Sequence, residues 1–377
     1  MNIGQQALKL HYKLKGKITI APKIKIKNRR QLSLIYTPGV AAVSQYLVKN
    51  KNNLSDYTVK NNSVAVVSDG SAVLGLGNIG PEGALPVMEG KCLIFKSFAN
   101  IDAFPIVLST QDPDEIIKTV IAIAPGFGGI NLEDIAAPKC FYIEEALKKQ
   151  LDIPVIHDDQ WGTATVVLAA FINSLKVVEK KIDQVKIVVL GAGAAGSAVV
   201  KILSAFGGKN ILVCDRQGII YQGRKGNSPE KEMLAKITNP NQEKGDLSFA
   251  LKRADVFIGV SGANLVTTTM VASMRKSAIV FAMANPQSEI MPTDAKKAGA
   301  YIIASGRSDF PNQVNNALVF PGVFRGALDH KVKKITLAML IKAAKNLASL
   351  VKNPTAKKII PSIFDRGVAD AVAKAIK

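Results

Sequence analysis

The chain has 377 residues, 48% of them hydrophobic, and a formal net charge of +20 from 49 basic and 29 acidic side chains. This length and composition suggest two domains with substantial cores. The sequence contains no uninterrupted apolar run of about eighteen residues, so we expect no membrane span. Three scattered cysteines and a start without an apolar signal-peptide core exclude a disulfide framework and favour a reduced, cytoplasmic protein.

The first half of the chain mixes short apolar runs with glycine-rich loops. The expected strands are residues 64–67, 105–108 and 154–156, and the expected helices are 113–124, 138–150 and 163–178. We expect a long loop over 68–83, and Asp112 is a candidate N-cap for the helix at 113–124. The helix at 163–178 is predicted to cross into a second domain, with the boundary near residue 160.

Strands and helices alternate from residue 185 onward. The expected strands are 186–190, 210–214, 256–260, 279–282 and 301–304, and helices are expected to start near 194, 229, 267 and 292. Two amphipathic helices, at about 335–351 and 362–376, close the chain. Strands separated by helices predict a parallel sheet covered on both faces. The predicted fold is therefore α/β, with an N-terminal α/β domain at 1–159 and a Rossmann-like, doubly wound domain with C-terminal helices at 160–377.

A glycine-rich turn follows the strand at 186–190 and reads Gly191-Ala192-Gly193-Ala194-Ala195-Gly196. In this pattern the first glycine allows a sharp turn, the second lets a pyrophosphate approach the main chain, and the third allows close helix packing. The N–H groups that open the next helix then face the phosphates. Asp215 ends the second strand about twenty residues later, where a ribose hydroxyl binds in such domains. The combination predicts a dinucleotide site.

Two acidic pairs lie in the first half of the chain, Glu133 with Asp134 and Asp158 with Asp159. Adjacent acids point to opposite faces of a strand and diverge by about 100° on a helix, so both reach one ion only where the backbone is irregular. Oxygen ligands alone favour hard divalent ions such as Mg²⁺ or Mn²⁺. The alternative is that one acid of each pair caps the helix that follows it.

A lysine and a tyrosine are candidate proton-transfer groups. Lys91 lies just before an apolar run, so it is a candidate buried lysine whose pKa desolvation and a nearby cation would lower toward neutrality. Such a lysine acts as a general base; the alternative is a surface lysine whose stem covers apolar side chains. Tyr36 lies in a turn before a predicted helix, where its hydroxyl is either a proton donor or part of a core.

Two asparagines lie in loops of the second half. Asn285 follows the strand at 279–282, and Asn316 precedes a Phe-Pro-Gly sequence. Ligands bind beyond the carboxyl ends of parallel strands, and an asparagine both donates to a carboxylate and accepts from a hydroxyl. The alternative is simple turn formation, which Asn-Pro favours by itself.

Taken together, these blocks resemble the malic enzyme family in its short bacterial form. The matching blocks, in order, are residues 36–40, 68–80, 88–91, 131–134, 157–160, 191–196, 285–286 and 306–316. The resemblance covers nearly the whole chain. It implies that the N-terminal domain is catalytic and that a homodimer converts L-malate to pyruvate and CO₂. It also implies reduction of NAD or NADP and dependence on Mg²⁺ or Mn²⁺.

The resemblance also implies roles for individual residues. Tyr36 matches the general acid, Lys91 the general base, and Asp158 the neighbouring acid that supports the lysine. The implied metal ligands are Glu133, Asp134 and Asp159. Asn285 and Asn316 match substrate-binding asparagines. The implied dinucleotide site is Gly191, Ala192, Gly193, Ala194, Ala195, Gly196, Asp215 and Asn285.

Two positions differ from relatives in the family. Trp161 stands where bacterial members commonly have histidine, which bears on helix packing near the metal loop. Ala72 stands where eukaryotic members have a substrate-binding arginine, so the substrate carboxylate must bind to other groups.

Coenzyme preference and two other functions stay open. Asp215 favours NAD because a carboxylate repels a 2′-phosphate, whereas Arg216, Arg224 and Lys225 lie close enough in sequence to hold one. A malolactic reaction, in which NAD stays bound and malate becomes lactate, would use the same residues. A non-catalytic basic protein is the third reading, but the lysines are spread along the chain rather than clustered. We therefore expect neither a nucleic-acid nor a membrane partner.

Overall fold

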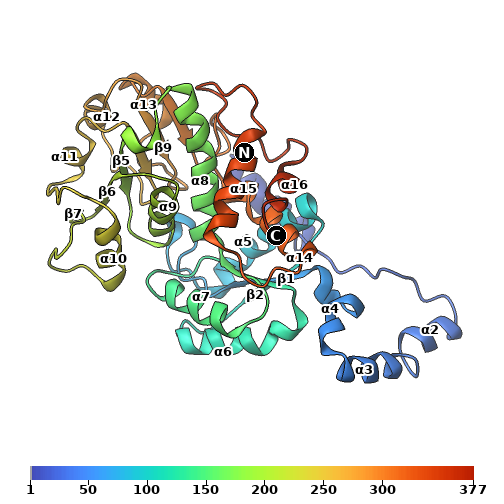
Figure 1. The fold of residues 1–377 in the computed structure, drawn as a ribbon. Coiled ribbons are helices and arrows are strands. Elements are labelled where there is room, and N and C mark those ends of the chain that lie inside the picture. Colours follow the sequence, from blue (N-terminus) through green and yellow to red (C-terminus); the bar gives the residue numbers. More distant parts are fainter. Residues whose placement is uncertain (1) are drawn as a thin grey trace.

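The computed structural model describes residues 2–377 and contains two β-sheets surrounded by helices (Figure 1). The first half of the chain builds a four-stranded sheet and the second half a six-stranded sheet. The long helix α8, Asp158–Val177, leads from the last strand of the first sheet toward the first strand of the second. The predicted α/β class is confirmed.

The first sheet is parallel, with the order β2-β1-β3-β4. Its strands are β1 (Ser63–Ser68), β2 (Asp102–Val107), β3 (Gly129–Leu132) and β4 (Val155–His157). β1 is buried along its whole length, as its run of valine and alanine predicts for a strand covered on both faces. Leu132 pairs with His157, so the residues that follow β3 and β4 meet at one edge of the sheet.

Three helices cover this sheet: α5 (Gly80–Ala99) on one face, and α6 (Pro113–Ile123) and α7 (Lys139–Gln150) on the other. α6 begins after Asp112, whose side chain accepts from two N–H groups of the first turn, as predicted. The sequence did not predict α5: its first residues fall in the loop expected over 68–83. Its glycines and Pro86 lower the helix propensity of this segment. The helix nevertheless buries Met88, Lys91 and Phe95, and this burial outweighs the local preference.

The second sheet has the order β10-β9-β8-β5-β6-β7, and only β7 runs antiparallel to its neighbour. Its strands are β5 (Lys186–Leu190), β6 (Asn210–Asp215), β7 (Gly218–Ile219), β8 (Val256–Gly259), β9 (Ile279–Ala282) and β10 (Ile302–Ser305). The intervening helices are α9 (Ala194–Ala205), α10 (Pro229–Ile237), α11 (Leu247–Leu251), α12 (Thr268–Ala272) and α13 (Pro292–Lys297). The predicted alternation of strand and helix is confirmed. The strand order reverses at β5, which is where a nucleotide crevice forms in such sheets.

The last helices of the chain return to the first sheet. They are α14 (Phe320–Asp329), α15 (Leu337–Ser349) and α16 (Val368–Ala373). The ring of Phe95 lies 4.7 Å from that of Phe320 and 5.5 Å from that of Phe324, centroid to centroid. A Cβ at Gly129, the first residue of β3, would lie 2.8 Å from the ring of Phe324. α14 therefore completes the core of the first sheet, although it belongs to the second half of the sequence.

Two terminal features differ from the sequence predictions. No helix was expected at α14, and the helix expected over 362–376 is reduced to α16, which begins after Gly367 with φ +81°. A residue with positive φ cannot continue a right-handed helix, so the preceding stretch is a loop. The division into domains 1–159 and 160–377 stays a prediction, because residues of both ranges pack around the first sheet.

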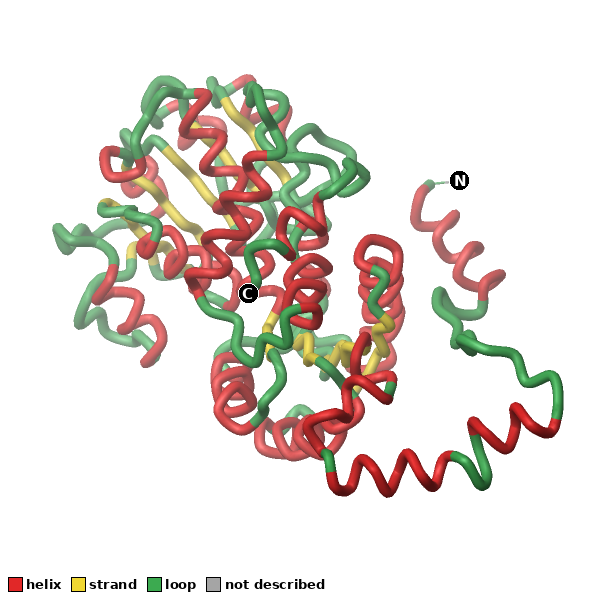
Figure 2. Tube along the Cα trace, turned by 45° about the vertical axis from the view of Figure 1, so that its right-hand side comes forward, coloured by secondary structure: helices red, strands yellow, loops and turns green. Residues whose placement is uncertain are grey.

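The N-terminal segment forms an arm that reaches away from the body of the protein (Figures 1 and 2). It contains α1 (Ile3–Leu14), α2 (Arg29–Ile35), α3 (Val40–Lys49) and α4 (Leu54–Tyr57), none of which has a buried residue. Lys17 anchors the arm by donating to the carbonyl of Pro86 in α5. Beside this anchor, a cavity of about 980 Å³ separates residues 18–23 from the edge strand β2.

The arm is both apolar and basic. Its most exposed apolar side chains are Ile3, Leu8, Tyr12, Ile20, Leu34, Tyr36 and Val48. The first acidic residue of the chain is Asp56, so the arm carries only positive charge before that point. An apolar surface of this extent on a folded chain marks an interaction site.

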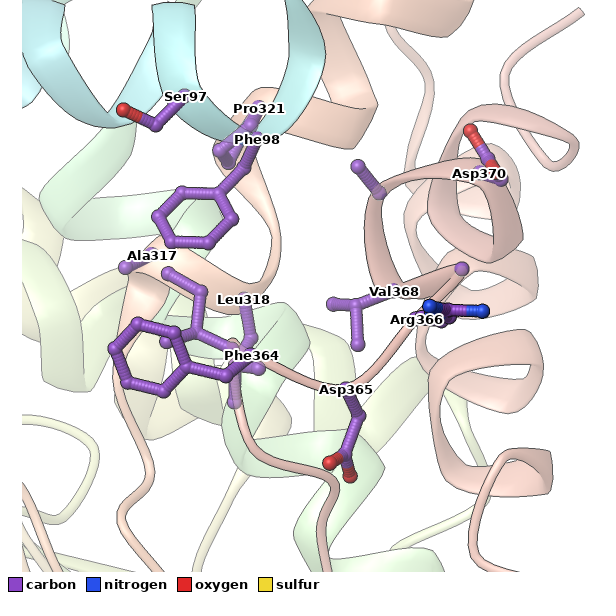
Figure 3. A pocket seen from close by; sticks show the side chains of 13 residues that line it. Ser97, Phe98, Ala317, Leu318, Pro321, Phe364, Asp365, Arg366, Val368 and Asp370 are labelled. Carbon is purple, nitrogen blue, oxygen red and sulfur yellow. The ribbon is translucent and has the colours of Figure 1, made fainter.

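A smaller pocket of about 280 Å³ lies between the end of α5 and the loop before α16 (Figure 3). Phe98 and Phe364 face each other across its mouth, with ring centroids 6.0 Å apart. None of the residues predicted to bind substrate, metal or coenzyme lines it. Among the described residues, no helix combines the length and apolarity needed to cross a bilayer.

Candidate active site

The predicted acids meet at the carboxyl edge of the first sheet. Glu133 directly follows β3, and Asp158 and Asp159 open α8 directly after β4. Carboxylate oxygens of Glu133, Asp134 and Asp159 lie within 4.8 Å of one another. Asp134 has φ +54°, which supplies the irregular backbone that two neighbouring acids need to face one point.

The alternative interpretation of these acids as helix caps is wrong. Pro138 is the N-cap residue of α7, well beyond the first acidic pair. His157 is the N-cap residue of α8, so both acids of the second pair lie inside the first turn of that helix. One carboxylate instead ties the two pairs together, because the N–H of Asp134 donates to Asp159 Oδ2 at 2.8 Å.

Lys91 lies in the middle of this cluster. Its Nζ is 2.6 Å from Asp158 Oδ2 and 2.8 Å from Glu133 Oε1. The ammonium also lies 4.3 Å from the ring centroid of Phe320, a cation–π distance. Lys91 is buried, so the interpretation as a surface lysine is wrong.

The lowered pKa expected for Lys91 presupposes a nearby cation and stays a prediction. Burial works to lower the pKa of Lys91, but the surrounding carboxylates, Asp158 first, outweigh it and hold the pKa above its ordinary value. Burial in turn raises the pKa of Asp158 to about 7 and raises the pKa of Glu133, even though Lys91 opposes both shifts. The acids are therefore more numerous than one ammonium can balance.

The cluster suits a divalent cation. Lys91 forms ion pairs with two carboxylates, those of Asp158 and Glu133, while Asp158 Oδ1 and Asn131 Oδ1 are buried without a hydrogen-bond partner among the described residues. Glu133, Asp134 and Asp159 offer only oxygen atoms, the donor set that Mg²⁺ and Mn²⁺ prefer. A buried excess of negative charge is costly unless a cation or protons compensate for it.

Asn316 lies beside Asp158. A Cβ at Gly162 would be 1.8 Å from Asp158 Oδ1 and 3.1 Å from the Cβ of Asn316, so only glycine leaves room at that position. Asn316 opens the short 3₁₀ helix η6, Asn316–Leu318, just before α14. The structure therefore brings this predicted substrate-binding residue to the acidic cluster.

Asn285 lies where loops of the two halves touch. It follows β9, and a Cβ at Gly75 in the first half would lie 2.2 Å from the Asn285 carbonyl oxygen. A Cβ at Gly306, after β10, would lie 2.7 Å from Asn285 Nδ2. Both glycines are therefore needed for this close approach.

The glycine-rich turn has the predicted geometry. Gly191 directly follows β5 and has φ +117°, and a Cβ there would lie 2.7 Å from the carbonyl oxygen of Val260. A Cβ at Gly193, the N-cap residue of α9, would meet nothing within 4 Å, so the main chain is open to a ligand. A Cβ at Gly196 would lie 1.9 Å from the Gly191 carbonyl oxygen, which explains the third glycine. The residues present fit a bound dinucleotide.

Asp215 is held by two cations at the end of β6. Arg224 makes a two-pronged contact with the carboxylate, at 2.9 Å and 2.5 Å, and Lys231 Nζ lies 2.7 Å from Asp215 Oδ2. Burial opposes the shift, but these hydrogen bonds hold the pKa of Asp215 well below its ordinary value.

Tyr36 does not join the cluster within the single chain. It follows α2 on the arm, and its side chain is 66% exposed. Figure 1 shows α2 at the far end of the arm, away from α5, which carries Lys91.

Sequence reasoning missed two buried acids that connect backbone segments near the edges of the two sheets. Glu144 in α7 accepts from the N–H of His157 and from the side chains of Gln160 and Trp161. Glu289 accepts from the N–H groups of Ser261 and Ala284 and so connects two loops at the carboxyl edge of the second sheet. The one sequence feature connected with Glu289 is Gly259, because a Cβ there would lie 2.5 Å from the Glu289 carboxylate carbon. This connection is visible only once the structure is known.

Comparison with known proteins gives a consistent result. Two family models match the chain, "Malic enzyme, N-terminal domain" over residues 15–113 and 108–148 and "Malic enzyme, NAD binding domain" over residues 161–377. A bifunctional malic/malolactic enzyme of Bacillus subtilis is 53% identical over all of this chain and 92% of its own length. An NAD-dependent malic enzyme of Geobacillus stearothermophilus is 50% identical, over all of this chain and 78% of its own length.

Solved structures agree with the sequence matches. The NAD-dependent malic enzyme of Thermotoga maritima superposes with a TM-score of 0.95 at 50% identity and 98% coverage of both chains. The malic enzyme of Pyrococcus horikoshii superposes with a TM-score of 0.94 at 48% identity, over 99% of this chain and 89% of that one. The chain described here belongs to the malic enzyme family.

Proposed function

We propose that this protein oxidises and decarboxylates L-malate to pyruvate and CO₂, with reduction of NAD or NADP and with Mg²⁺ or Mn²⁺ as activator. The observation that carries the proposal is the buried Lys91 amine, 2.6 Å from Asp158, beside three acids able to hold an ion. The names of close relatives support the same reaction. The test is malate turnover with each coenzyme, with and without Mn²⁺, followed by absorbance of the reduced nicotinamide.

Lys91 is the proposed general base. As a neutral amine it takes the proton of the malate C2 hydroxyl while a hydride leaves C2 for the nicotinamide. The β-keto acid so formed then loses CO₂, and protonated Lys91 returns its proton to the C2 oxygen. Asp158, 2.6 Å away, orients the amine throughout.

Glu133, Asp134 and Asp159 are the proposed ligands of the metal ion. When bound, the ion supplies positive charge that polarises the C2 oxygen and offsets the carboxylates that otherwise keep Lys91 protonated. Asn316, beside Asp158, and Asn285, between the loops of the two halves, are the proposed hydrogen-bonding partners of the substrate.

Tyr36 is the proposed donor of the proton to C3 of enolpyruvate, and we infer that it acts in the site of a second copy. Its exposed position on an arm without buried residues supports this inference. A homodimer would cover the apolar arm, and two-fold symmetry would place one arm at each site. The part of the arm before Asp56 carries only positive charge, which is complementary to the acidic cluster.

Mixing two inactive variants tests this arrangement. We expect Tyr36→Phe and Lys91→Ala each to lose malate turnover, and a one-to-one mixture, unfolded and refolded together, to regain it. If the tyrosine acts across the dimer, one site of each mixed dimer has both groups intact, which is about one quarter of all sites. Tyr12→Phe, also on the arm and 86% exposed, is the matched control. A mixture that stays inactive would place Tyr36 in its own subunit's site or outside catalysis.

NAD is the proposed preferred coenzyme, with NADP as an acceptable one. Asp215 repels a 2′-phosphate, but Arg224 and Lys231 balance its charge and weaken that repulsion. We expect Asp215→Asn to raise the NADP-to-NAD ratio of kcat/KM by about tenfold, equivalent to ~1.4 kcal/mol. The measurement is initial rates with both coenzymes at saturating malate and Mn²⁺. An unchanged ratio would show that other residues set the preference.

A malolactic reaction is the second candidate, favoured by the bifunctional name of the Bacillus subtilis relative. In that case the hydride returns from the coenzyme to pyruvate before release. Product analysis separates the two functions, because lactate forms without net reduced coenzyme in the malolactic reaction. Salt-sensitive binding to nucleic acid without malate turnover would instead favour a basic binding protein.

We also propose a cytoplasmic location without nucleic-acid or membrane partners. Support comes from the three cysteines, which are all free and buried. Fractionation of the producing cells, with malate turnover as the marker, tests the location.

A further inference from the structure

We propose that Glu144 is a positioning residue for the metal site, acting through the β4–α8 junction that carries Asp158 and Asp159. This inference rests on the proposed function, because it presupposes a divalent ion at the acidic cluster. It concerns a side chain in α7 to which neither the sequence motifs nor the proposed reaction gives a role.

Glu144 holds the junction on both sides of the two acids. Its side chain is 7% exposed, and Oε1 accepts from the N–H of His157 at 2.9 Å, just before the acids. Oε2 accepts from Gln160 Nε2 and from Trp161 Nε1, both at 3.1 Å, just after them. One buried side chain therefore fixes the backbone and two side chains around the acids.

The junction has few other constraints of its own. β4 is only three residues long, lies at the edge of the sheet and pairs with β3 alone. α8 follows it at once, and His157 gives that helix no side-chain cap. A short edge strand followed by an uncapped helix leaves the direction of the first turn to tertiary contacts. Glu144 supplies three such contacts from the neighbouring helix, in addition to those that Lys91 and the Asp134 N–H make to Asp158 and Asp159.

The charge of Glu144 is itself balanced, so the network is complete. Lys148 Nζ lies 2.7 Å from Glu144 Oε1, one helical turn away, and 5.6 Å from the ring centroid of Trp161. Removing acceptor capacity from such a network leaves donors inside the protein unpaired, which is unfavourable. The first turn of α8 would then shift rather than keep its geometry.

The fluorescence of Trp161 allows the β4–α8 junction to be monitored in solution. It is the single tryptophan of the chain, so tryptophan emission comes from this one ring, which donates to Glu144. It also lies two positions after Asp159 in α8, close enough in sequence for a paramagnetic ion at the acids to quench it. Binding of Mn²⁺ is therefore measurable on the whole protein without substrate, coenzyme or turnover.

The test is a Mn²⁺ titration of wild type and Glu144→Gln. Glutamine keeps the size of the side chain but replaces one acceptor oxygen with a donor NH₂, which cannot satisfy the donors on that side. We expect the dissociation constant for Mn²⁺ to rise by about 10–100-fold, the usual effect of losing a partner that orients a metal ligand. Both Trp161 emission and the electron paramagnetic resonance signal of free Mn²⁺ give this constant.

Glu145→Gln is the matched control, because Glu145 is the next residue of α7 and its side chain is 70% exposed. It should bind Mn²⁺ as wild type does. Equal affinity in Glu144→Gln and wild type would overturn the inference while leaving the metal site intact. Absence of Mn²⁺ binding in wild type would overturn the metal site, and this inference with it.

A second pair of variants decides the question should Glu144→Gln fail to fold. Trp161→Phe loses the ring N–H donor to Glu144, whereas Trp161→His keeps one. Free Mn²⁺ measured by paramagnetic resonance should show weaker binding in the phenylalanine variant and recovery in the histidine variant. Wild-type affinity in Trp161→Phe would overturn the inference by this route.

Discussion

Replacing Lys91 by alanine should lower kcat by roughly 10²–10⁴-fold, the span expected for an acid–base group. The Lys91 amine is the proposed proton-transfer group, and it lies inside the acidic cluster, 2.6 Å from Asp158 and 2.8 Å from Glu133. Removing its positive charge from among the carboxylates should leave Mn²⁺ affinity unchanged or higher. Loss of turnover with retained ion binding is thus the signature of a base. The measurements are steady-state kinetics and a Mn²⁺ titration of the same preparation.

Lys96→Ala is the control for Lys91→Ala. Lys96 lies in the same helix, is half-exposed and pairs with Asp102 at 2.8 Å. It should keep wild-type kinetics, because exposed ion pairs contribute little. Near-normal turnover in Lys91→Ala would remove the lysine from the proposed role. Lost ion binding there would mean that the substitution disturbed the cluster itself.

Asp159→Ala should abolish both malate turnover and its dependence on Mn²⁺. Asp159 shares the ion cluster with Glu133 and Asp134, and it also accepts from the Asp134 N–H at 2.8 Å. Loss of a direct ligand should weaken ion binding by more than the 10–100-fold typical of outer partners. Asp152→Ala is the control, since Asp152 lies just before β4 and its side chain is 90% exposed. Unchanged ion affinity in Asp159→Ala would exclude it from the ligand set.

The sheets could be predicted from the sequence because their strands are continuous apolar runs between turns. The strand at 186–190 has the predicted bounds, and that at 279–282 does as well. Helices stabilised by long-range packing were missed. α5 contains Pro86 and several glycines, and α14 begins with Phe320 and Pro321, so local preference speaks against both.

The site was only partly accessible to sequence reasoning. Acid pairs and the glycine-rich turn are visible as local patterns, and the left-handed backbone at Asp134 follows from the need for two neighbours to face one point. The raising effect of Asp158 and Glu133 on the pKa of Lys91 was not predictable, because these carboxylates are distant from it in sequence. Glu144 was missed for the same reason: nothing in its helix distinguishes it from the exposed Glu145 beside it.

Because α14 packs on the first sheet, that sheet is completed by a segment that is synthesised much later than its strands. Phe320 covers the ammonium of Lys91, and Phe324 packs on Gly129, yet both are synthesised long after the strands of that sheet. A nascent chain that has completed only its first sheet should therefore leave hydrophobic surface and the proposed catalytic amine open to water. We expect the proposed active centre to be complete only after α14 has left the ribosome.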